Sequence, residues 1–287
     1  MTVDKDSQHH VGIVGGGTMG VGIAYVFAVA GAAVTVVEPV IARHSTFLAT
    51  IDEALKGAVE RSKLSSVAAS AARDRLRLVA AIDAIEAHSS LVIETVPEQL
   101  ELKQQVLGQI EATSPALIAT NTSAISIDVL AASLRDPSQF LGMHFFNPVW
   151  SLPLVELICG QATSEESLDA ARAAVADIGK ESIVVADIPG FATSRLDMGA
   201  ALEAMRMLED GVASAEDIDR AAVLAYRHPV GPLRLSDIVG LDVRLDIART
   251  LERAHGPRFA PPKILIDLVA QGRLGVKTGR GFHDWNE

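Results

Sequence analysis

The chain has 287 residues, of which 49% are hydrophobic and 21% charged, and its formal net charge is −11. This composition is typical of a globular protein with one large domain or two ordinary ones. The negative charge argues against nucleic acid as a partner, since phosphate binding requires a basic surface. No apolar run approaches the roughly 20 residues that cross a bilayer. Residues 1–10 are polar, and Cys159 is the one cysteine, so we expect a cytoplasmic protein with no metal and no membrane partner.

The first two thirds of the chain alternate short β-branched runs with amphipathic segments, a pattern typical of strands and helices around a parallel sheet. We expect strands at 10–14, 34–37, 76–80, 91–95 and 116–120, and helices at 18–30, 98–111 and 127–134. Residues 42–75 are helical throughout and long for a simple crossover. They are therefore predicted to project from the sheet as a hairpin.

Two further strands, at 140–145 and 154–158, are separated by too few residues for a crossover helix. They are therefore predicted to pair antiparallel. A helix at 165–178 and a strand at 182–186 follow.

The sequence pattern changes after Ile188-Pro189-Gly190, because only helical periodicity remains beyond it. We therefore expect an α/β domain over residues 1–187 and an all-helical C-terminal domain over residues 188–287. A stripe of small and apolar side chains in the second domain is suited to burial, either within that domain or against a second subunit. The stripe consists of Ala200, Ala201, Ala204 and Met205.

A glycine-rich segment, Gly15–Gly20, follows the first predicted strand and opens the first predicted helix. In such a G-x-G-x-x-G turn, Gly15 permits the tight bend and Gly17 lets a pyrophosphate approach the backbone. Gly20 lets the helix pack closely on the strand. The helix N-terminus at Thr18-Met19 supplies N–H groups and positive dipole for the phosphates.

An acidic residue, Glu38, stands at the end of the second predicted strand. A carboxylate there accepts both ribose hydroxyls of a dinucleotide and repels a 2′-phosphate, so NAD is favoured over NADP. The sequence therefore predicts a Rossmann-type doubly wound sheet in the first domain. A glycine turn with an incidental acid is the alternative.

Polar clusters follow two other strands, where a ligand of a parallel sheet is expected to lie. They are Val96-Pro97-Glu98 and Asn121-Thr122-Ser123. Polar residues at strand ends are also ordinary loop and N-cap material, so the pattern alone leaves both explanations open.

The candidate general base is His144, which lies among large apolar residues just before a predicted chain reversal. Oxidation of a secondary alcohol needs a base for the hydroxyl proton, and histidine is suited to this near neutral pH. Glu156 lies on the next strand, and the hairpin could place its carboxylate beside the imidazole to fix the tautomer. The alternative is a hydrogen-bonded core histidine with no catalytic role.

At these residues the sequence resembles the L-3-hydroxyacyl-CoA dehydrogenase family, which includes bacterial 3-hydroxybutyryl-CoA dehydrogenases. The resemblance runs through nearly the whole chain. The matching segments are 15–20, 92–94, 96–98, 121–123, 144–148, 154–156, 189–191, 228–232, 240–242 and 275–282. The resemblance implies a homodimer that oxidises an L-3-hydroxyacyl-CoA to the 3-ketoacyl-CoA with NAD, as in fatty acid β-oxidation.

The resemblance also implies roles for individual residues. His144 would be the general base, Glu156 its partner, and Ser123 a donor to the 3-oxygen of the substrate. The implied cofactor contacts are Glu38 at the adenosine ribose, Glu98 and Lys103 near the nicotinamide half, Asn121, and Lys277 from the second domain. Without the resemblance, Lys277 would be taken as a solvated surface lysine.

The resemblance also implies substrate contacts, but here the chain departs from the family at two positions. Asn147 and Ser194 are expected to contact the substrate, although the family usually has Asn where this chain has Ser194. Ala54 falls where some relatives have a serine that contacts CoA. A local excess of positive charge on the projecting segment supplies candidate CoA contacts at Lys56, Arg61 and Lys63, although a solvated helical face is an equal explanation. Two other functions stay open: a dehydrogenase of a free hydroxy acid, such as a sugar acid or carnitine, and a non-catalytic NAD-binding protein.

Overall fold

The computed structural model describes residues 9–285, and the chain divides after Ile188 into two units. In the described part of the first unit the strands are β1 (His10–Val14), β2 (Ala33–Val37), β3 (Leu76–Val79), β4 (Leu91–Glu94), β5 (Ile118–Thr120), β6 (Phe140–Phe145), β7 (Leu154–Cys159) and β8 (Glu181–Ala186). They form one sheet in the order β3-β2-β1-β4-β5-β6-β7-β8.

The sheet is parallel from β3 through β6, and its strand order reverses beside β1. In doubly wound folds, dinucleotides bind at the carboxyl ends of the strands beside such a reversal of strand order. The other end of the sheet breaks the parallel pattern, because β7 runs antiparallel to β6. The predicted α/β, Rossmann-type fold class and the antiparallel hairpin are confirmed.

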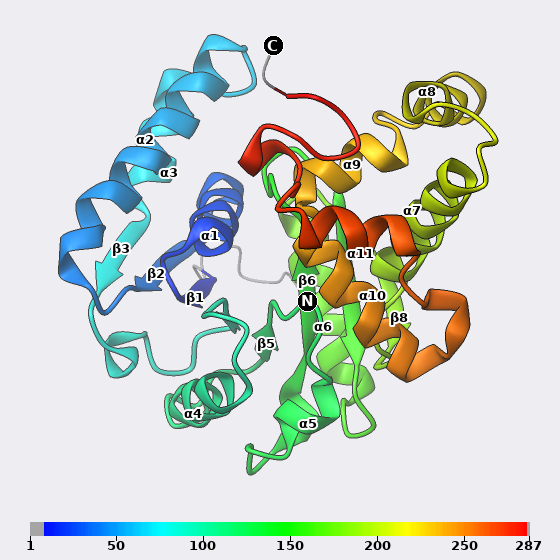
Figure 1. Ribbon diagram of the computed structural model, residues 1–287. Coiled ribbons are helices and arrows are strands. Elements are labelled where there is room, and N and C mark those ends of the chain that lie inside the picture. The colour runs from blue at the N-terminus through cyan, green and yellow to red at the C-terminus, as the bar shows by residue number, and fades with distance from the viewer. Residues whose placement is uncertain (1–8, 286–287) are drawn as a thin grey trace. The chain divides into compact units, whose positions relative to one another are not determined.

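Helices cover both faces of this sheet (Figure 1). They are α1 (Thr18–Ala30), α2 (His44–Glu60), α3 (Ser66–Asp74), α4 (Leu100–Glu111), α5 (Ile127–Ala131) and α6 (Glu165–Asp177), with short 3-10 turns η1 (Ile41–Arg43), η2 (Ile82–Ala84) and η3 (Pro137–Gln139). Apolar side chains of α1, α2, α3 and α6 share one core with the sheet. Leu91 and Ile93 of β4 belong to that core, whereas the buried Val92 between them faces the other side, as strand geometry requires.

The segment predicted to project as a helical hairpin forms two helices, α2 and α3, beside the β3 edge of the first unit (Figure 1). The hydroxyl of Ser65 accepts from the N–H of Ala68 and begins α3 there. Phe47, Ile51 and Leu55 of α2 are buried in the core shared with α1. The hairpin therefore packs along one face of the unit and leaves its turn, residues 61–65, at the surface.

The second unit is helical in its described residues. It contains α7 (Thr193–Glu209), α8 (Ala215–Tyr226), α9 (Pro232–Val239), α10 (Leu241–His255) and α11 (Lys263–Ala270), with 3-10 turns η4 (Pro257–Phe259) and η5 (Val276–Thr278). Ala201, Ala204 and Met205 of α7 are buried in this unit's own core, whereas Ala200 is exposed. Most of the small-residue stripe is therefore used within the unit.

A buried carboxylate ties the last described segment of the chain to α9. Asp237 is 1% exposed and accepts hydrogen bonds from the backbone N–H groups of Phe282 and His283 and from the indole N–H of Trp285. These bonds close residues 275–285 into a compact turn, and that turn carries Lys277.

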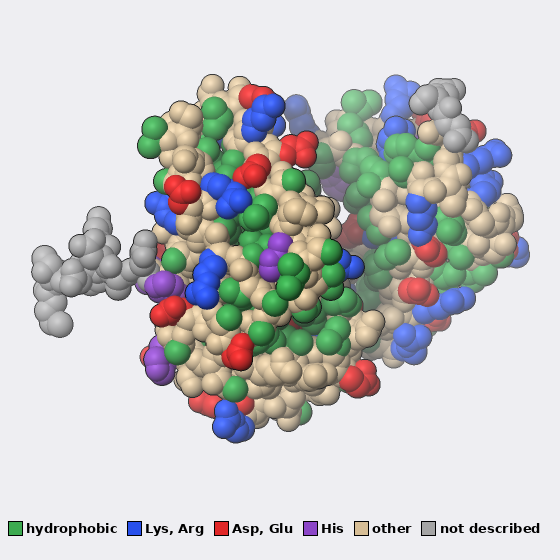
Figure 2. Space-filling model, turned by 90° about the vertical axis from the view of Figure 1, so that its left-hand side faces the viewer, with side chains coloured by type: hydrophobic (Ala, Val, Ile, Leu, Met, Phe, Trp, Pro, Cys, Tyr) green, Lys and Arg blue, Asp and Glu red, His purple; other side chains and the backbone are tan. Residues whose placement is uncertain are grey.

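The described helices include none that is both long and apolar enough to cross a bilayer. On the face of the molecule drawn in Figure 2, acidic and basic side chains are interspersed. That mixture is unlike the continuous basic surface that nucleic acid binding needs.

Candidate active site

The glycine turn between β1 and α1 is shaped by close backbone contacts. Gly15 has a φ of 116°, and a Cβ there would lie 2.8 Å from the carbonyl oxygen of Thr95. A Cβ on Gly20 would lie 1.9 Å from the carbonyl oxygen of Gly15. A Cβ on Gly17 would meet nothing within 4 Å, so there is open space where the sequence motif places a pyrophosphate.

The N-terminus of α1 has the polarity that a pyrophosphate needs. An α-helix leaves its first four N–H groups without intrahelical partners, and the backbone bond from Val21 to Gly17 comes after Thr18, Met19 and Gly20. The first turn contains no acidic residue, and Gly17 gives no side-chain cap. The positive end of the helix is therefore not neutralised by its own first turn, and these residues fit a dinucleotide phosphate.

Glu38 lies against the glycine turn, at the end of β2. It is 4% exposed, and one carboxylate oxygen accepts from the N–H of Val40 at 2.9 Å. A Cβ on Gly16 would come within 2.9 Å of the other oxygen, Oε2. The acid is therefore fixed beside the turn, as a ribose contact requires.

His144 and Glu156 are register partners on β6 and β7. Their side chains meet with 2.8 Å between Nδ1 of the imidazole and Oε2 of the carboxylate. His144 is 7% exposed and Glu156 is 0% exposed, and the Phe146 ring lies 4.4 Å from the imidazole, centroid to centroid. A carboxylate at Nδ1 fixes the orientation of the imidazole ring.

Asn121 follows β5 and connects the ends of β4 and β6, the two strands on either side of β5. Its side-chain oxygen accepts from the N–H of Phe145 at 2.8 Å, and its own N–H donates to the carbonyl of Glu94. It therefore braces the residue after His144. Asn147 lies exposed in the loop between β6 and β7.

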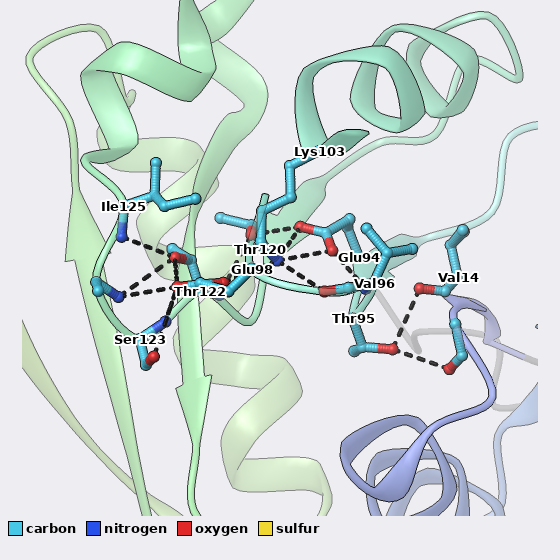
Figure 3. Close-up of polar contacts among 12 residues, drawn as sticks. Val14, Glu94, Thr95, Val96, Glu98, Lys103, Thr120, Thr122, Ser123 and Ile125 are labelled. Carbon is cyan, nitrogen blue, oxygen red and sulfur yellow. Dashed lines mark hydrogen bonds and ion pairs between the residues drawn. The ribbon is translucent and has the colours of Figure 1, made fainter. Parts of the chain in front are cut away.

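A buried ion pair lies behind this edge, at the carboxyl end of β4 (Figure 3). The ammonium of Lys103 reaches Glu94 Oε1 at 2.9 Å and Oε2 at 3.0 Å, and it also donates to the carbonyl of Val96. Thr120 donates to Glu94 Oε2 at 2.7 Å. Lys103 is 1% exposed, and in this structure its ammonium is surrounded by oxygens of Glu94 and Val96.

Glu98 links this ion pair to the segment that carries Ser123. Its Oε2 lies 3.2 Å from the Lys103 ammonium. Its Oε1 accepts from the Thr122 hydroxyl at 2.5 Å and from the N–H groups of Ser123 and Ala124 at 3.0 and 3.1 Å. One carboxylate therefore gathers the turn that presents the exposed Ser123 (Figure 3).

The two acids of this cluster differ in their pKa values. Burial raises the pKa of Glu94, and the nearby Lys103 opposes that rise. Burial also raises the pKa of Glu98, but the hydrogen bond from Thr122 and the charge of Lys103 outweigh it, so the net pKa is lowered. Glu98 is therefore held as a carboxylate.

Two of the predicted site residues belong to the second unit. Ser194 is half-buried in the first turn of α7. Lys277 lies in η5 and donates to both carboxylate oxygens of Asp242, and that hydrogen bond is the main cause of the lowered pKa of Asp242. Lys277 is 45% exposed, so its charge is available at the surface of its unit.

The predicted CoA-binding cations divide into two kinds. Lys56 lies 3.9 Å from Glu60, one helical turn away. Arg61 and Lys63 are exposed at the hairpin turn, and neither has an ion-pair partner among the described residues. Lys63 also lines a hollow of about 480 Å³. The described chain holds no cluster of three or more His, Cys, Asp or Glu side chains arranged for a metal ion.

Sequence reasoning assigned no role to several residues that the structure places in the site. Glu94, Thr95 and Thr120 stand at strand ends, and Thr95 donates to the carbonyls of Val14 and Gly15. Two signals fell on Glu94, an acid closing the apolar run of β4 and its place in the family-matching segment 92–94, but neither gave it a role. Its partner Lys103 lies across a turn in a helix, and no local pattern connects the two.

A glycine turn that fits a dinucleotide phosphate, and a histidine braced by a carboxylate at the same edge of the sheet, define the class of protein as a dinucleotide-dependent dehydrogenase. Comparison with known proteins makes the class specific. The NAD binding domain of 3-hydroxyacyl-CoA dehydrogenase matches residues 10–188, and the C-terminal domain of the same enzyme matches residues 190–285. The chain belongs to the 3-hydroxyacyl-CoA dehydrogenase family, as the sequence resemblance predicted.

Individual relatives agree over nearly the full length. A 3-hydroxybutyryl-CoA dehydrogenase of Mycobacterium tuberculosis is 39% identical, covering 98% of this chain and 100% of that protein. A 3-hydroxyadipyl-CoA dehydrogenase of Escherichia coli is 36% identical, covering 96% of this chain and 58% of that protein. The crystal structure of an (S)-3-hydroxybutyryl-CoA dehydrogenase from Ralstonia eutropha matches with a TM-score of 0.93 and 38% identity, over 98% of this chain and 100% of that one.

Two glycine variants separate packing from cofactor binding. Gly20→Ala is expected to lower the free energy of unfolding by about 1–3 kcal/mol, because its Cβ overlaps a backbone carbonyl. Gly17→Ala is expected to change the free energy of unfolding by less than about 0.5 kcal/mol and yet weaken NAD binding, because its Cβ enters the open space beside the turn. Urea denaturation and NADH fluorescence titration measure the two effects. Equal stability losses in both variants would contradict the assignment.

The lowered pKa of Glu98 predicts an acid-sensitive contribution to stability. An acid whose pKa is lower in the folded state stabilises the fold above its ordinary value of 4.5, and that contribution is lost as the pH falls through the folded-state pKa. The difference in unfolding free energy between the native protein and Glu98→Gln should therefore shrink below pH 4.5. Glu101→Gln, at an exposed position in the first turn of α4, controls for the loss of one charge. A pH-independent difference for Glu98→Gln would refute the prediction.

Proposed function

We propose that the protein oxidises an L-3-hydroxyacyl-CoA to the 3-ketoacyl-CoA, with NAD as hydride acceptor. The observation that carries this proposal is the His144–Glu156 pair, 2.8 Å apart, in a sheet whose carboxyl edge also holds the glycine turn. The residues at that edge fit a dinucleotide, and the family to which the chain belongs gives the class of substrate.

In this mechanism His144 is the catalytic base. It takes the proton of the 3-hydroxyl group through Nε2 as the C3–H bond breaks, and the bound nicotinamide supplies the site to which the hydride moves. Glu156 accepts the Nδ1 hydrogen bond and stabilises the imidazolium that forms. The hydroxyl of Ser123 donates to the 3-oxygen and fixes its direction. In the reverse reaction, the protonated His144 returns the proton.

The cofactor contacts follow from the same geometry. Glu38 holds the adenosine ribose, and the N–H groups at Gly17, Thr18 and Met19 hold the pyrophosphate. We assign Glu98 and Lys103 to the nicotinamide half, Asn121 to a further cofactor contact, and Lys277 to a contact from the second unit.

The acyl group is the least determined part of the substrate. The relatives are named for 3-hydroxybutyryl-CoA and 3-hydroxyadipyl-CoA, and we propose a short acyl chain. Ser194 is assigned to the substrate together with Asn147. Because a serine hydroxyl is shorter than the family's usual amide, Ser194 would act through a water or on a shifted substrate. This departure is the observation that favours a free hydroxy acid as the second candidate substrate.

The CoA nucleotide is assigned to the hairpin turn. Arg61 and Lys63 are cations without an acidic partner in the described chain. Lys63 lines a hollow together with Tyr25, Trp150 and Lys180, and the charge of Arg61 acts to lower the pKa of Tyr25, although burial raises it overall. The Trp150 ring is 41% exposed and meets Tyr25 edge-on at 5.8 Å. An exposed aromatic face next to cations suits an adenine ring and its phosphates.

We also propose a homodimer that works in the cytoplasm. Large apolar side chains are exposed on two helices of the second unit, α7 and α8, with Leu196, Leu224 and Tyr226 each more than 70% exposed. Their burial against a second copy would account for this exposure.

The function is tested with a panel of hydroxyacyl-CoA thioesters and free hydroxy acids, measured by NADH absorbance. We expect turnover with 3-hydroxybutyryl-CoA and little with free acids such as carnitine. His144→Gln should reduce kcat by about 10²–10⁴-fold and leave the NADH dissociation constant unchanged. Turnover of free acids alone would favour the second candidate, and tight NADH binding with no turnover would favour a non-catalytic protein.

The nucleotide assignment is tested by removing the nucleotide from the substrate. Trp150→Ala should raise KM for the CoA thioester by about 10-fold, from the loss of one stacking contact. It should leave KM for the N-acetylcysteamine thioester of the same acyl group unchanged. Lys63→Ala should behave likewise, and Lys56→Ala, whose charge is shared with Glu60, should have a smaller effect. Equal increases with both thioesters would contradict the assignment.

A further inference from the structure

We propose that Asp237 is a positioning residue for Lys277, because it holds the turn that carries this lysine against the junction between α9 and α10. In this role Asp237 acts through Lys277 and does not itself meet the cofactor. The effect on cofactor binding rests on the proposed function, which assigns Lys277 to the cofactor. The effect on the turn is independent of that assignment.

The side chain of Lys277 lies over the junction between α9 and α10. Asp237 belongs to α9, Asp242 to the first turn of α10, and Gly240 separates the two helices. The ammonium of Lys277 donates to both carboxylate oxygens of Asp242. A Cβ on Gly240 would lie 3.3 Å from the ammonium nitrogen and 3.5 Å from the carbon next to it. The ammonium end of Lys277 is therefore held at the junction, and Gly240 leaves the room that the side chain needs.

The backbone end of Lys277 belongs to a turn that is seated on Asp237. Gly275 and Arg280 exchange two backbone hydrogen bonds, at 2.9 and 3.1 Å, and Lys277 lies between them in the chain. A Cβ on Gly275 would lie 2.1 Å from the Asp237 carbonyl oxygen, and a Cβ on Gly281 would lie 1.9 Å from Asp237 Oδ1. Neither position has room for a side chain. The turn therefore rests directly on α9 (Figure 1).

The carboxylate of Asp237 matches three donors that follow the turn. Its Oδ1 accepts from the N–H of Phe282 at 2.9 Å, and its Oδ2 accepts from the N–H of His283 at 2.8 Å and the indole N–H of Trp285 at 3.0 Å. Both oxygens must therefore act as acceptors. An asparagine has the same shape but one oxygen, and its NH₂ group would face an N–H donor. The position thus requires a carboxylate and not only a side chain of this size.

A double-mutant cycle in NADH binding tests the link between Asp237 and Lys277. Lys277→Met removes a cationic contact and should raise the NADH dissociation constant by about 10-fold. Asp237→Asn should raise it by at least about 3-fold, because the lysine then starts from a displaced turn. The double variant should bind NADH no more weakly than Lys277→Met alone, since an absent lysine cannot be misplaced. NADH fluorescence titration measures all three.

The cycle distinguishes positioning from a purely structural role. Asp237→Asn should lower Tm by the same amount with or without Lys277, because the lost hydrogen bonds are those of the following residues. If Asp237→Asn weakens NADH binding as much in the Lys277→Met background as in the native one, the positioning role is wrong. Native NADH binding in Asp237→Asn alone, with weaker binding in Lys277→Met, would also overturn it.

The matched control is Asp284→Asn, the same substitution in the same segment. The Asp284 side chain is 61% exposed and lies 3.9 Å from Arg280. Its loss should leave both Tm and the NADH dissociation constant unchanged. Weaker NADH binding in this control would contradict the proposal, because it would trace the effect to any loss of negative charge near the turn.

Amide hydrogen exchange separates this proposal from the proposed function, since it needs no ligand. A peptide spanning residues 276–281 should exchange at least about 10-fold faster in Asp237→Asn than in the native protein, and at the native rate in Asp284→Asn. Native exchange in Asp237→Asn would overturn the proposal. Native NADH binding in Lys277→Met, by contrast, would refute the assignment of Lys277 to the cofactor.

A milder variant keeps the test decisive where Asp237→Asn does not fold. Trp285→Phe removes one of the three donors and keeps an aromatic ring at that position. Exchange over residues 276–281 should quicken by about 3-fold, as expected for the loss of one hydrogen bond. An unchanged exchange rate in Trp285→Phe would count against the seating of the turn on Asp237.

Discussion

The antiparallel pairing of β6 with β7 is the constraint on which the site depends. It makes His144 and Glu156 direct partners across two strands, so their contact is held by the sheet's hydrogen bonds and not by a loop. A slip of one residue would turn one side chain to the opposite face. The parallel strands beside β6 hold the glycine turn at the same edge. The change of strand direction between β6 and β7 therefore places the His144–Glu156 pair in the same sheet as the glycine turn.

The site is rich in acids, yet each is fixed by donors from the chain. Glu38 accepts from a backbone N–H, Glu156 meets an imidazole, and Glu98 collects three donors beside an ammonium. Buried carboxylates without such partners would be protonated or would destabilise the fold. An anionic dinucleotide can approach this edge because the helix start at the glycine turn contributes positive potential and no acid of its own.

Much of the fold could be predicted from the sequence because its signals are local. β1, α1 and β6 have the expected bounds, and Gly31 ends α1 in the left-handed conformation. The break in the 42–75 segment was less visible, since no glycine or proline between residues 58 and 75 marks the turn. The dyad was predictable for the same local reason: a short hairpin between two apolar strands allows few registers.

The Glu94–Lys103 contact was not predictable in this way. It depends on the angle at which α4 leaves the turn after β4, and that angle is set by packing of the helix on the sheet. Lys103 looked like one of several polar residues on a helix, and such residues are normally solvated. Complete burial of its charge is costly, so the surrounding oxygens must be in place whenever the chain is folded. The contact least visible in the sequence is therefore one that the fold has to form completely.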